Sequence, residues 1–247
     1  MGASRIEFRL RMAINAAIIV LGFWAPWSEF LGSGERISLL ERLALVLSRA
    51  GLLPFAIATA GIAALAAVLA ALGVLLRVWG TAYLGPATVN NAAMKARAVM
   101  ADGPYRYVRN PLYLGIWFMA AGLAFLMPET GALVTMLLLT LFLLRLILGE
   151  EQFLTVQLGE PYRVYLQAVP RIAPRLRTSL PRTGASPRWF HAILTELIPI
   201  GVFVALVCYP WTFDHRLLPR IVLISFGLSL IVRALGRGES ATGIMAG

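Results

Sequence analysis

Residues 111–149 read PLYLGIWFMAAGLAFLMPETGALVTMLLLTLFLLRLILG, and this stretch decides the fold. It holds two apolar segments, 111–127 and 130–149, joined by a short turn around Glu129. Runs of about 17–25 apolar residues are long enough to cross the hydrocarbon core of a bilayer as helices. Because so short a connection makes neighbouring helices antiparallel, the stretch predicts a transmembrane helical hairpin.

Four further apolar segments flank this hairpin, at 12–28, 52–79, 191–210 and 217–235. The 247-residue chain is 59% hydrophobic and 14% charged. Soluble domains average about 45–50% apolar and about 25% charged residues, so the composition excludes a soluble enzyme. The sequence therefore predicts an all-α fold, a polytopic integral membrane protein with about six transmembrane helices.

The chain divides into three predicted parts. Residues 1–50 hold the first span and a loop with leucines at helical spacing, which is typical of an amphipathic surface helix. Residues 51–178 form a core around the hairpin, and residues 179–247 form a linker with a final pair of spans. The first apolar run follows arginines and ends in tryptophans instead of a small-residue cleavage site. We therefore interpret it as a retained span and not as a signal peptide.

The charge pattern predicts how the spans are oriented. The net charge is +10, from 22 basic and 12 acidic residues. Because cytoplasmic loops carry the excess of arginine and lysine, both termini and the long polar segments 80–110 and 150–190 are predicted to be cytoplasmic. The arginine and alanine usage favours a bacterial inner membrane.

Composition also excludes other classes of protein and site. One cysteine, Cys208, can form neither an intrachain disulfide nor a thiolate cluster. Two histidines, His191 and His215, cannot complete a zinc motif, so no metal site is predicted. A nucleic-acid-binding protein needs a soluble basic face. We assign the basic residues instead to membrane topology and to contact with membrane lipids.

The first polar motif precedes the hairpin and reads DGPYRYVRNPLYLG, residues 102–115. Asn110 and Pro111 suit the N-cap and first position of a helix. Free backbone N–H groups at that helix start, with Arg106 and Arg109 beside them, predict an anion site at the membrane surface. The alternative is a capped helix start whose arginines only set topology and contact anionic lipid.

The second polar motif follows the hairpin. Glu150 and Glu151 are expected at the C-terminal end of the fourth span, where the helix dipole disfavours negative charge. Arg145, about one turn earlier, is expected to snorkel or to pair with them. The alternative is that the acids mark the membrane boundary and that Tyr162 and Tyr165 are interfacial anchors.

The hairpin brings both motifs to one face of the membrane. Arginines and backbone N–H groups suit a carboxylate, glutamates suit an ammonium group or ribose hydroxyls, and aromatic side chains suit a base. The motifs together therefore favour a zwitterionic ligand that carries a sugar.

The order GPYRYVRNPLYLG, apolar hairpin, EEQFLTVQLGEPYRVYLQAVPRIAP resembles the isoprenylcysteine carboxyl methyltransferase family, to which phospholipid N-methyltransferases are more distantly related. The similarity covers roughly residues 75–175 and begins at LLRVWGTAYLG. It implies a membrane enzyme that binds S-adenosyl-L-methionine in a cytoplasmic-face pocket. A lipophilic small molecule or lipid-modified substrate would enter from the bilayer. Residues 51–178 would then be the methyltransferase core.

The resemblance also implies roles for individual residues. Catalytic roles fall on Arg109, Asn110, Glu150 and Glu151. Cofactor-binding roles fall on Gly103, Tyr105, Arg109, Asn110, Pro111, Tyr113, Gly115, Glu150, Glu151, Tyr162, Tyr165 and Arg171.

Asn110 departs from the family pattern, which has histidine there. Asparagine can donate a hydrogen bond to a carboxylate but cannot take a proton near neutral pH. A carboxylate acceptor needs no proton removed, only placement against the sulfonium methyl. An ammonium acceptor must lose a proton, and only Glu150 or Glu151 could accept it.

Two other functions rank lower. A sterol or steroid reductase-like enzyme using NADPH carries a similar turn, but here no asparagine directly precedes Tyr113, and the glutamate pair is present. A non-catalytic transporter or scaffold predicts polar residues at mid-membrane, and the spans contain few.

Overall fold

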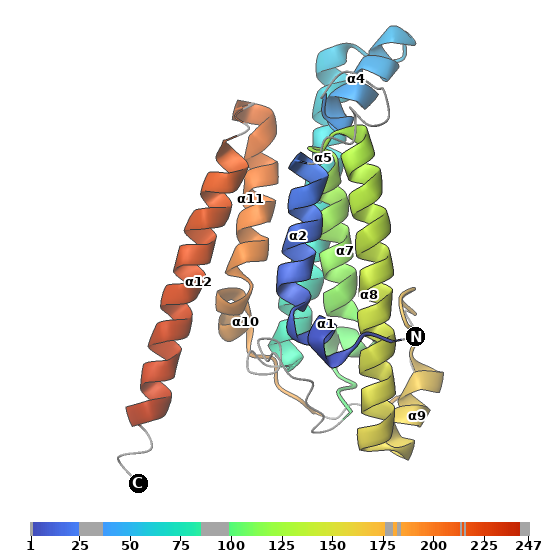
Figure 1. Ribbon diagram of the computed structural model, residues 1–247, viewed down its shortest axis with the longest axis vertical. Coiled ribbons are helices and arrows are strands. Elements are labelled where there is room, and N and C mark those ends of the chain that lie inside the picture. The colour runs from blue at the N-terminus through green and yellow to red at the C-terminus, as the bar shows by residue number, and fades with distance from the viewer. Residues whose placement is uncertain are drawn as a thin grey trace.

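The computed structural model describes residues 2–24, 37–84, 99–175, 180–181, 184–212, 214 and 216–242. The regular structure of these residues is helical, with one isolated bridge between Ser38 and Pro128 (Figure 1). The predicted all-α class is therefore confirmed. Residues 25–28 of the first predicted span, and the parts of the predicted loops at 29–36, 85–98 and 176–179, lie outside the described residues.

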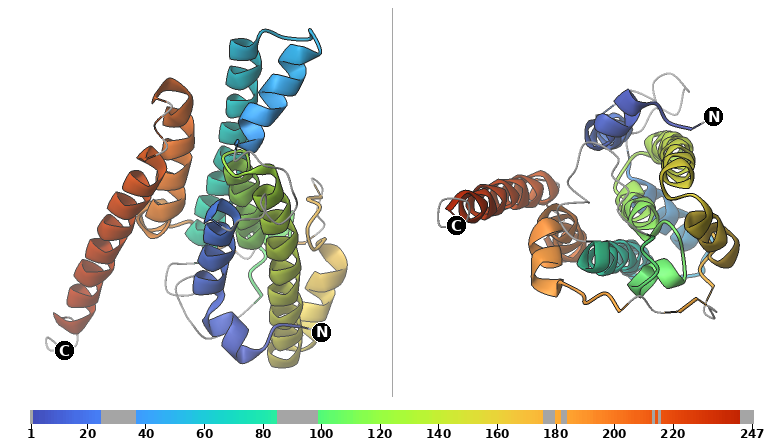
Figure 2. Two further views of the ribbon diagram at one scale, coloured as in Figure 1. Left: turned by 45° about the horizontal axis from the view of Figure 1, so that its top comes forward. Right: turned by 90° about the horizontal axis from the view of Figure 1, so that it is seen from below.

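Four helices form the body of the fold: α2 (Arg11–Trp24), α5 (Phe55–Leu84), α7 (Pro111–Ala124) and α8 (Glu129–Leu158). The predicted hairpin is α7 and α8, joined through Met127 and Pro128. The most extensive helix contact is between α5 and α7, and α8 also packs against α2 (Figure 2). Buried apolar side chains such as Leu139, Leu143 and Leu146 fill the contact of α8 with the N-terminal helices.

Length and hydropathy identify α5 and α8 as helices able to cross a membrane. A third candidate is the bent pair α10 (Trp189–Thr195) and α11 (Leu197–Thr212), if it counts as one span. The shorter apolar helices are α2, α7 and residues 217–232 of α12 (Leu217–Thr242). The chain is a helical membrane protein whose described residues contain two to three candidate spans by these criteria, and the count of six stays a prediction.

The predicted amphipathic helix is α4 (Leu39–Arg49). Ser38 and Glu41 form a capping box, which satisfies backbone N–H groups at the helix start. Leu40 and Ala44 face Ala58 and Ile62 of α5 in a small apolar cluster. Figure 1 places α4 at the end of the bundle opposite to α9 (Glu160–Ala168).

The prediction that Glu150 and Glu151 lie at the C-terminal end of a helix is wrong. Helix α8 continues past Glu150 and Glu151 to Leu158 and ends at Gly159, whose φ of 63° favours glycine. The dipole argument for paired acids at a helix C-terminus therefore does not apply. Both carboxylates instead project from the side of a continuous helix.

Arg145 also differs from its predicted pairing. Its Nη2 lies 2.9 Å from Oε1 of Glu7 in α1 (Arg5–Arg9), and its backbone oxygen accepts from Ala3 over 2.8 Å. The N-terminal segment thus crosses α8 beside Gly149, where a Cβ on Gly2 would lie 2.7 Å from the Gly149 Cα. The partner of Arg145 is therefore Glu7, and not Glu150 or Glu151 as predicted.

The first of the C-terminal spans is broken. The predicted span 191–210 divides into α10 and α11, which meet at Glu196 with a bend of 70°. Helix α11 packs against both α12 and α5, and α12 lies on the side of α11 that faces away from the other helices (Figures 1 and 2).

Candidate functional site

The two polar motifs meet at one end of the bundle, which we call the motif end: the start of α7, the last turns of α8, helix α9 and the short helix η1 (Gly103–Arg106). Two backbone hydrogen bonds join the segments. Arg109 donates to Pro170 over 2.9 Å, and Arg175 donates to Tyr107 over 2.9 Å. Residues 170–175 therefore lie beside residues 107–109, as the hairpin geometry predicts.

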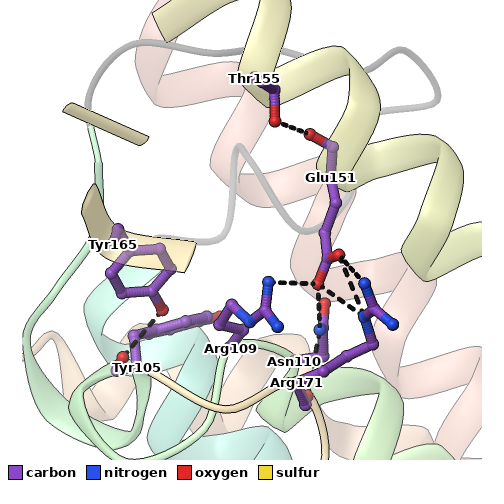
Figure 3. A network of polar contacts seen from close by, with 7 residues as sticks. All are labelled: Tyr105, Arg109, Asn110, Glu151, Thr155, Tyr165 and Arg171. Carbon is purple, nitrogen blue, oxygen red and sulfur yellow. Dashed lines mark hydrogen bonds and ion pairs between the residues drawn. The ribbon is translucent and has the colours of Figure 1, made fainter. Parts of the chain in front are cut away.

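Glu151 is the centre of the densest polar cluster (Figure 3). Its Oε1 lies 3.2 Å from Arg109 Nη1, and its Oε2 lies 2.8 Å from Arg171 Nη2. Arg171 Nε also donates to both oxygens, over 3.2 and 3.1 Å. Because Glu151 is only 7% exposed, these charge-assisted bonds offset the cost of burying its charge.

The charges of this cluster do not cancel. Two guanidinium groups, those of Arg109 and Arg171, face the single carboxylate of Glu151, which leaves one net positive charge. In addition, the buried Nε of Arg109 has no hydrogen-bond partner among the described residues. The cluster therefore retains both the charge and a donor for an anionic ligand.

Asn110 occupies the N-cap position of α7, but its side chain makes no capping bond. Its Nδ2 instead donates to Glu151 Oε1 over 3.4 Å and to the backbone oxygen of Arg171 over 3.2 Å. Asn110 therefore holds the predicted N-cap position, but its amide joins the two motifs and does not cap the helix. Pro111 holds the first helical position as predicted and is buried.

Glu150 lies in a different environment from its neighbour. The Tyr113 hydroxyl of α7 donates to Glu150 Oε2 over 2.8 Å. Arg11, at the start of α2, acts on the same carboxylate electrostatically. Consecutive helical residues point about 100° apart, which is why the two glutamates reach different partners.

Three tyrosines close the motif end on the α9 side. Tyr162 and Tyr165 are buried with ring centroids 5.7 Å apart. The Tyr165 hydroxyl donates to the backbone oxygen of Tyr105 over 2.8 Å. Burial raises the pKa of both α9 phenols, and nearby tyrosine or glutamate charges add to this, so both remain neutral hydroxyl groups at physiological pH.

A cavity of about 350 Å³ lies beside η1. Its lining consists of Trp79, Tyr83, Asp102, Gly103, Arg106, Tyr107, Gly184 and Ala185. Gly103 has a φ of 57°, and a Cβ there would overlap the Tyr83 ring. The volume falls in the range of about 300–1,000 Å³ typical of ligand pockets. Its walls combine aromatic rings with one carboxylate and one guanidinium.

The structure thus places the predicted residues in distinct surroundings. The central cluster consists of Arg109, Asn110, Glu151 and Arg171, and Tyr113 forms a second pair with Glu150. Tyr162 and Tyr165 pack together, Tyr165 is bonded to the backbone of Tyr105, and Gly103 lines the cavity. Gly115 faces α5 instead, where a Cβ would lie 2.8 Å from the Gly73 oxygen.

Sequence reasoning missed three contributions to the motif end. Trp79 and Tyr83 line the cavity, and Arg11 acts on Glu150. Trp79 and Tyr83 lie four residues apart in sequence, on one face of a helix, and this spacing is the signal that could have found them. Arg11 carries no local signal, because its proximity depends on tertiary packing.

Comparison with known proteins identifies one family. Residues 62–160 match the family model described as phospholipid methyltransferase. This range runs from within α5 to the first residue of α9, and so contains the hairpin, Arg109, Asn110 and both glutamates. No curated protein and no solved structure gives a significant match.

Proposed function

We propose that the protein is a methyltransferase of the phospholipid methyltransferase family, whose model residues 62–160 match and which includes isoprenylcysteine carboxyl methyltransferase-like membrane enzymes. On this premise it transfers a methyl group from S-adenosyl-L-methionine to a lipophilic acceptor. The observation that carries the proposal is the Glu151 cluster. It joins Arg109 and Asn110 at the start of α7 to Glu151 on α8, and both to Arg171 after α9. Bound S-adenosyl-L-methionine supplies an activated methyl group on a sulfonium.

The donor set of the motif end fits this cofactor. The net positive charge of Arg109, Arg171 and Glu151, with the unpartnered Arg109 Nε, suits the methionine carboxylate. The cavity walls suit the adenosine part, since Trp79 and Tyr107 can pack against a base and Asp102 can accept from ribose hydroxyls. Segment 102–111 contributes to both regions, with Arg109 in the cluster and Asp102 and Tyr107 in the cavity wall.

We assign different roles to the two glutamates. Glu151 is committed to arginines and positions the cofactor-binding groups. Glu150 is bonded to the neutral hydroxyl of Tyr113 and is assigned to the acceptor. From an ammonium acceptor Glu150 would take the proton, which leaves the nitrogen with the lone pair that methylation needs. A carboxylate acceptor is already ionised, and Tyr113 then positions it.

The acceptor class follows from the surroundings. Helices α7 and α8 are apolar along their length, so an isoprenylcysteine-like carboxylate or a lipid headgroup can reach the motif end from the bilayer. A water-soluble cofactor requires the motif end to be cytoplasmic. We therefore propose that both chain termini are cytoplasmic in a bacterial inner membrane, and the arginine distribution supports this orientation.

Calorimetry on the purified protein in detergent tests the proposal. We expect S-adenosyl-L-methionine to bind and NADPH not to bind. Glu151→Gln removes the carboxylate that holds the mostly buried Arg109 and the part-exposed Arg171. We expect the cofactor to bind more weakly by about 2–5 kcal/mol, which corresponds to roughly 30-fold or more in Kd. The matched control is Glu160→Gln, an exposed glutamate at the same end of the bundle. Binding of NADPH alone would overturn the proposal.

A further inference from the structure

A second buried ion pair lies outside the site described above. Arg77 of α5 and Glu196, at the bend between α10 and α11, form a two-point contact, with Nε–Oε2 2.6 Å and Nη2–Oε1 3.1 Å. The Thr81 hydroxyl donates to Oε1 over 2.6 Å. Glu196 is 0% exposed and Arg77 is 8% exposed.

Stability alone does not account for such a pair. Removing two charges from water costs so much that well-packed apolar residues of similar volume often stabilise a fold equally or better. A buried charge pair does, however, fix one geometry, because each partner is satisfied only when the other is in place. The Arg77–Glu196 pair therefore fixes how α10 and α11 sit against α5.

This geometry extends to the start of α7. Gly115 leaves the space that the Arg77 stem occupies, since a Cβ on Gly115 would lie 2.6 Å from the Arg77 Cγ. One turn further along α5, a Cβ on Gly80 would lie 2.9 Å from Leu112 Cδ2 and 3.3 Å from the Tyr105 hydroxyl. The Arg77 side chain thus lies between Glu196 and the first turns of α7, which carry Asn110 and Tyr113.

We propose that Glu196 is a positioning residue for methyl transfer: it holds Arg77 against Gly115 and thereby fixes the first turns of α7. Glu196 lies beyond residues 62–160, so the C-terminal helices contribute to the enzyme a residue that the matched segment lacks. A second attachment supports this, because Arg188, just before α10, donates from its backbone to Ala82 over 2.9 Å. The inference rests on the proposed function for its activity readout.

Two variants separate positioning from stability. Glu196→Gln leaves the Arg77 charge unbalanced, and we expect turnover to fall about 10- to 100-fold, as for a small misplacement of reacting groups. The double variant Arg77→Met/Glu196→Leu replaces the pair by apolar side chains, and we expect it to melt at or above the wild-type temperature yet to keep the loss of turnover. If the pair only stabilised the fold, the double variant would regain wild-type activity together with wild-type stability.

Hydrogen exchange gives a readout that does not need activity. In both variants, the amides of residues 114–116, which are the first with helical hydrogen bonds in α7, should exchange faster than in the wild type. The control removes the ion pair of Arg42 and Glu129 at the other end of the bundle, by Arg42→Gln and Glu129→Gln, which should change neither readout. Wild-type turnover and wild-type exchange in the apolar double variant would overturn the inference. A wild-type protein that transfers no methyl group would instead overturn the proposed function, and exchange would still test the coupling.

Discussion

Glu150 and Glu151 are neighbours in the sequence, but their carboxylates are bound by different groups. Tyr113 donates to Glu150 over 2.8 Å from the adjacent helix of the hairpin. Arg171 lies 2.8 Å from Glu151 and comes from beyond α9. Two consecutive residues of α8 thus carry one carboxylate bound by guanidinium groups and one bonded to a hydroxyl.

Glu150→Gln should reduce turnover while leaving cofactor affinity unchanged. For an amine acceptor, losing the group that takes the proton costs about 10²–10⁴-fold in kcat. The Kd for S-adenosyl-L-methionine should remain within about twofold, because Glu150 is not bonded to either arginine of the Glu151 cluster. Transfer of a labelled methyl group to extracted lipids, together with calorimetry, measures both quantities. An increase in Kd equal to that of Glu151→Gln would contradict the division of roles.

Tyr113→Phe removes the hydroxyl that donates to Glu150 and nothing else. A hydrogen bond to a charged group contributes about 1.5–3 kcal/mol, so we expect kcat to fall by roughly 10- to 100-fold. Trp117→Phe is the matched control, because Trp117 makes another α7–α8 hydrogen bond, to Thr140 over 3.0 Å, further along the hairpin. If both variants lose the same activity, the effect belongs to the hairpin and not to Glu150.

The sequence predicted the elements whose signals are local. The hairpin follows from the lengths of its two apolar segments, and α4 follows from leucines at helical spacing. The meeting of Arg109 with Glu151 follows from the hairpin. The side chain of Asn110 could not be predicted, because both a cap and a bond to Glu151 satisfy an amide, and tertiary geometry decides between them.

The Arg77–Glu196 pair was missed for a related reason. Its partners are 119 residues apart, so no local pattern connects them. A signal was nevertheless present, since Arg77 lies in the predicted span 52–79 and Glu196 in the predicted span 191–210. An ionisable residue inside an apolar segment requires a partner, and opposite charges in two spans are candidates for each other.

The contact of Glu7 with Arg145 should depend on pH. Hydrogen bonds from Arg145, and then from Ser4, lower the pKa of Glu7 from 4.5 to about 2. Because this carboxyl pKa is lowered by folding, its stabilising contribution is present above pH 4.5 and is lost as the pH falls towards about 2.

Exchange of the amides in residues 2–10 measures this attachment. In the wild type, exchange corrected for its intrinsic pH dependence should accelerate as the pH falls through this window. Glu7→Gln should exchange fast throughout, so the difference between the two proteins should vanish at the acidic end. A difference that stays constant with pH would show that the charge of Glu7 does not hold the segment.

Gly115→Ala should destabilise the fold by forcing α5 and α7 apart. The added Cβ would lie 2.6 Å from the Arg77 Cγ and 2.8 Å from the Gly73 oxygen. Because the Gly73 oxygen belongs to the backbone, relieving the second contact requires α5 itself to shift. Overpacking of this kind costs about 1–3 kcal/mol and should lower the melting temperature in detergent. Gly61→Ala is the matched control on α5, because a Cβ there meets nothing within 4 Å, and alanine is the better helix former by about 1 kcal/mol. If Gly115→Ala melts at or above the temperature of Gly61→Ala, the close contact of α5 with α7 does not depend on a missing side chain at Gly115.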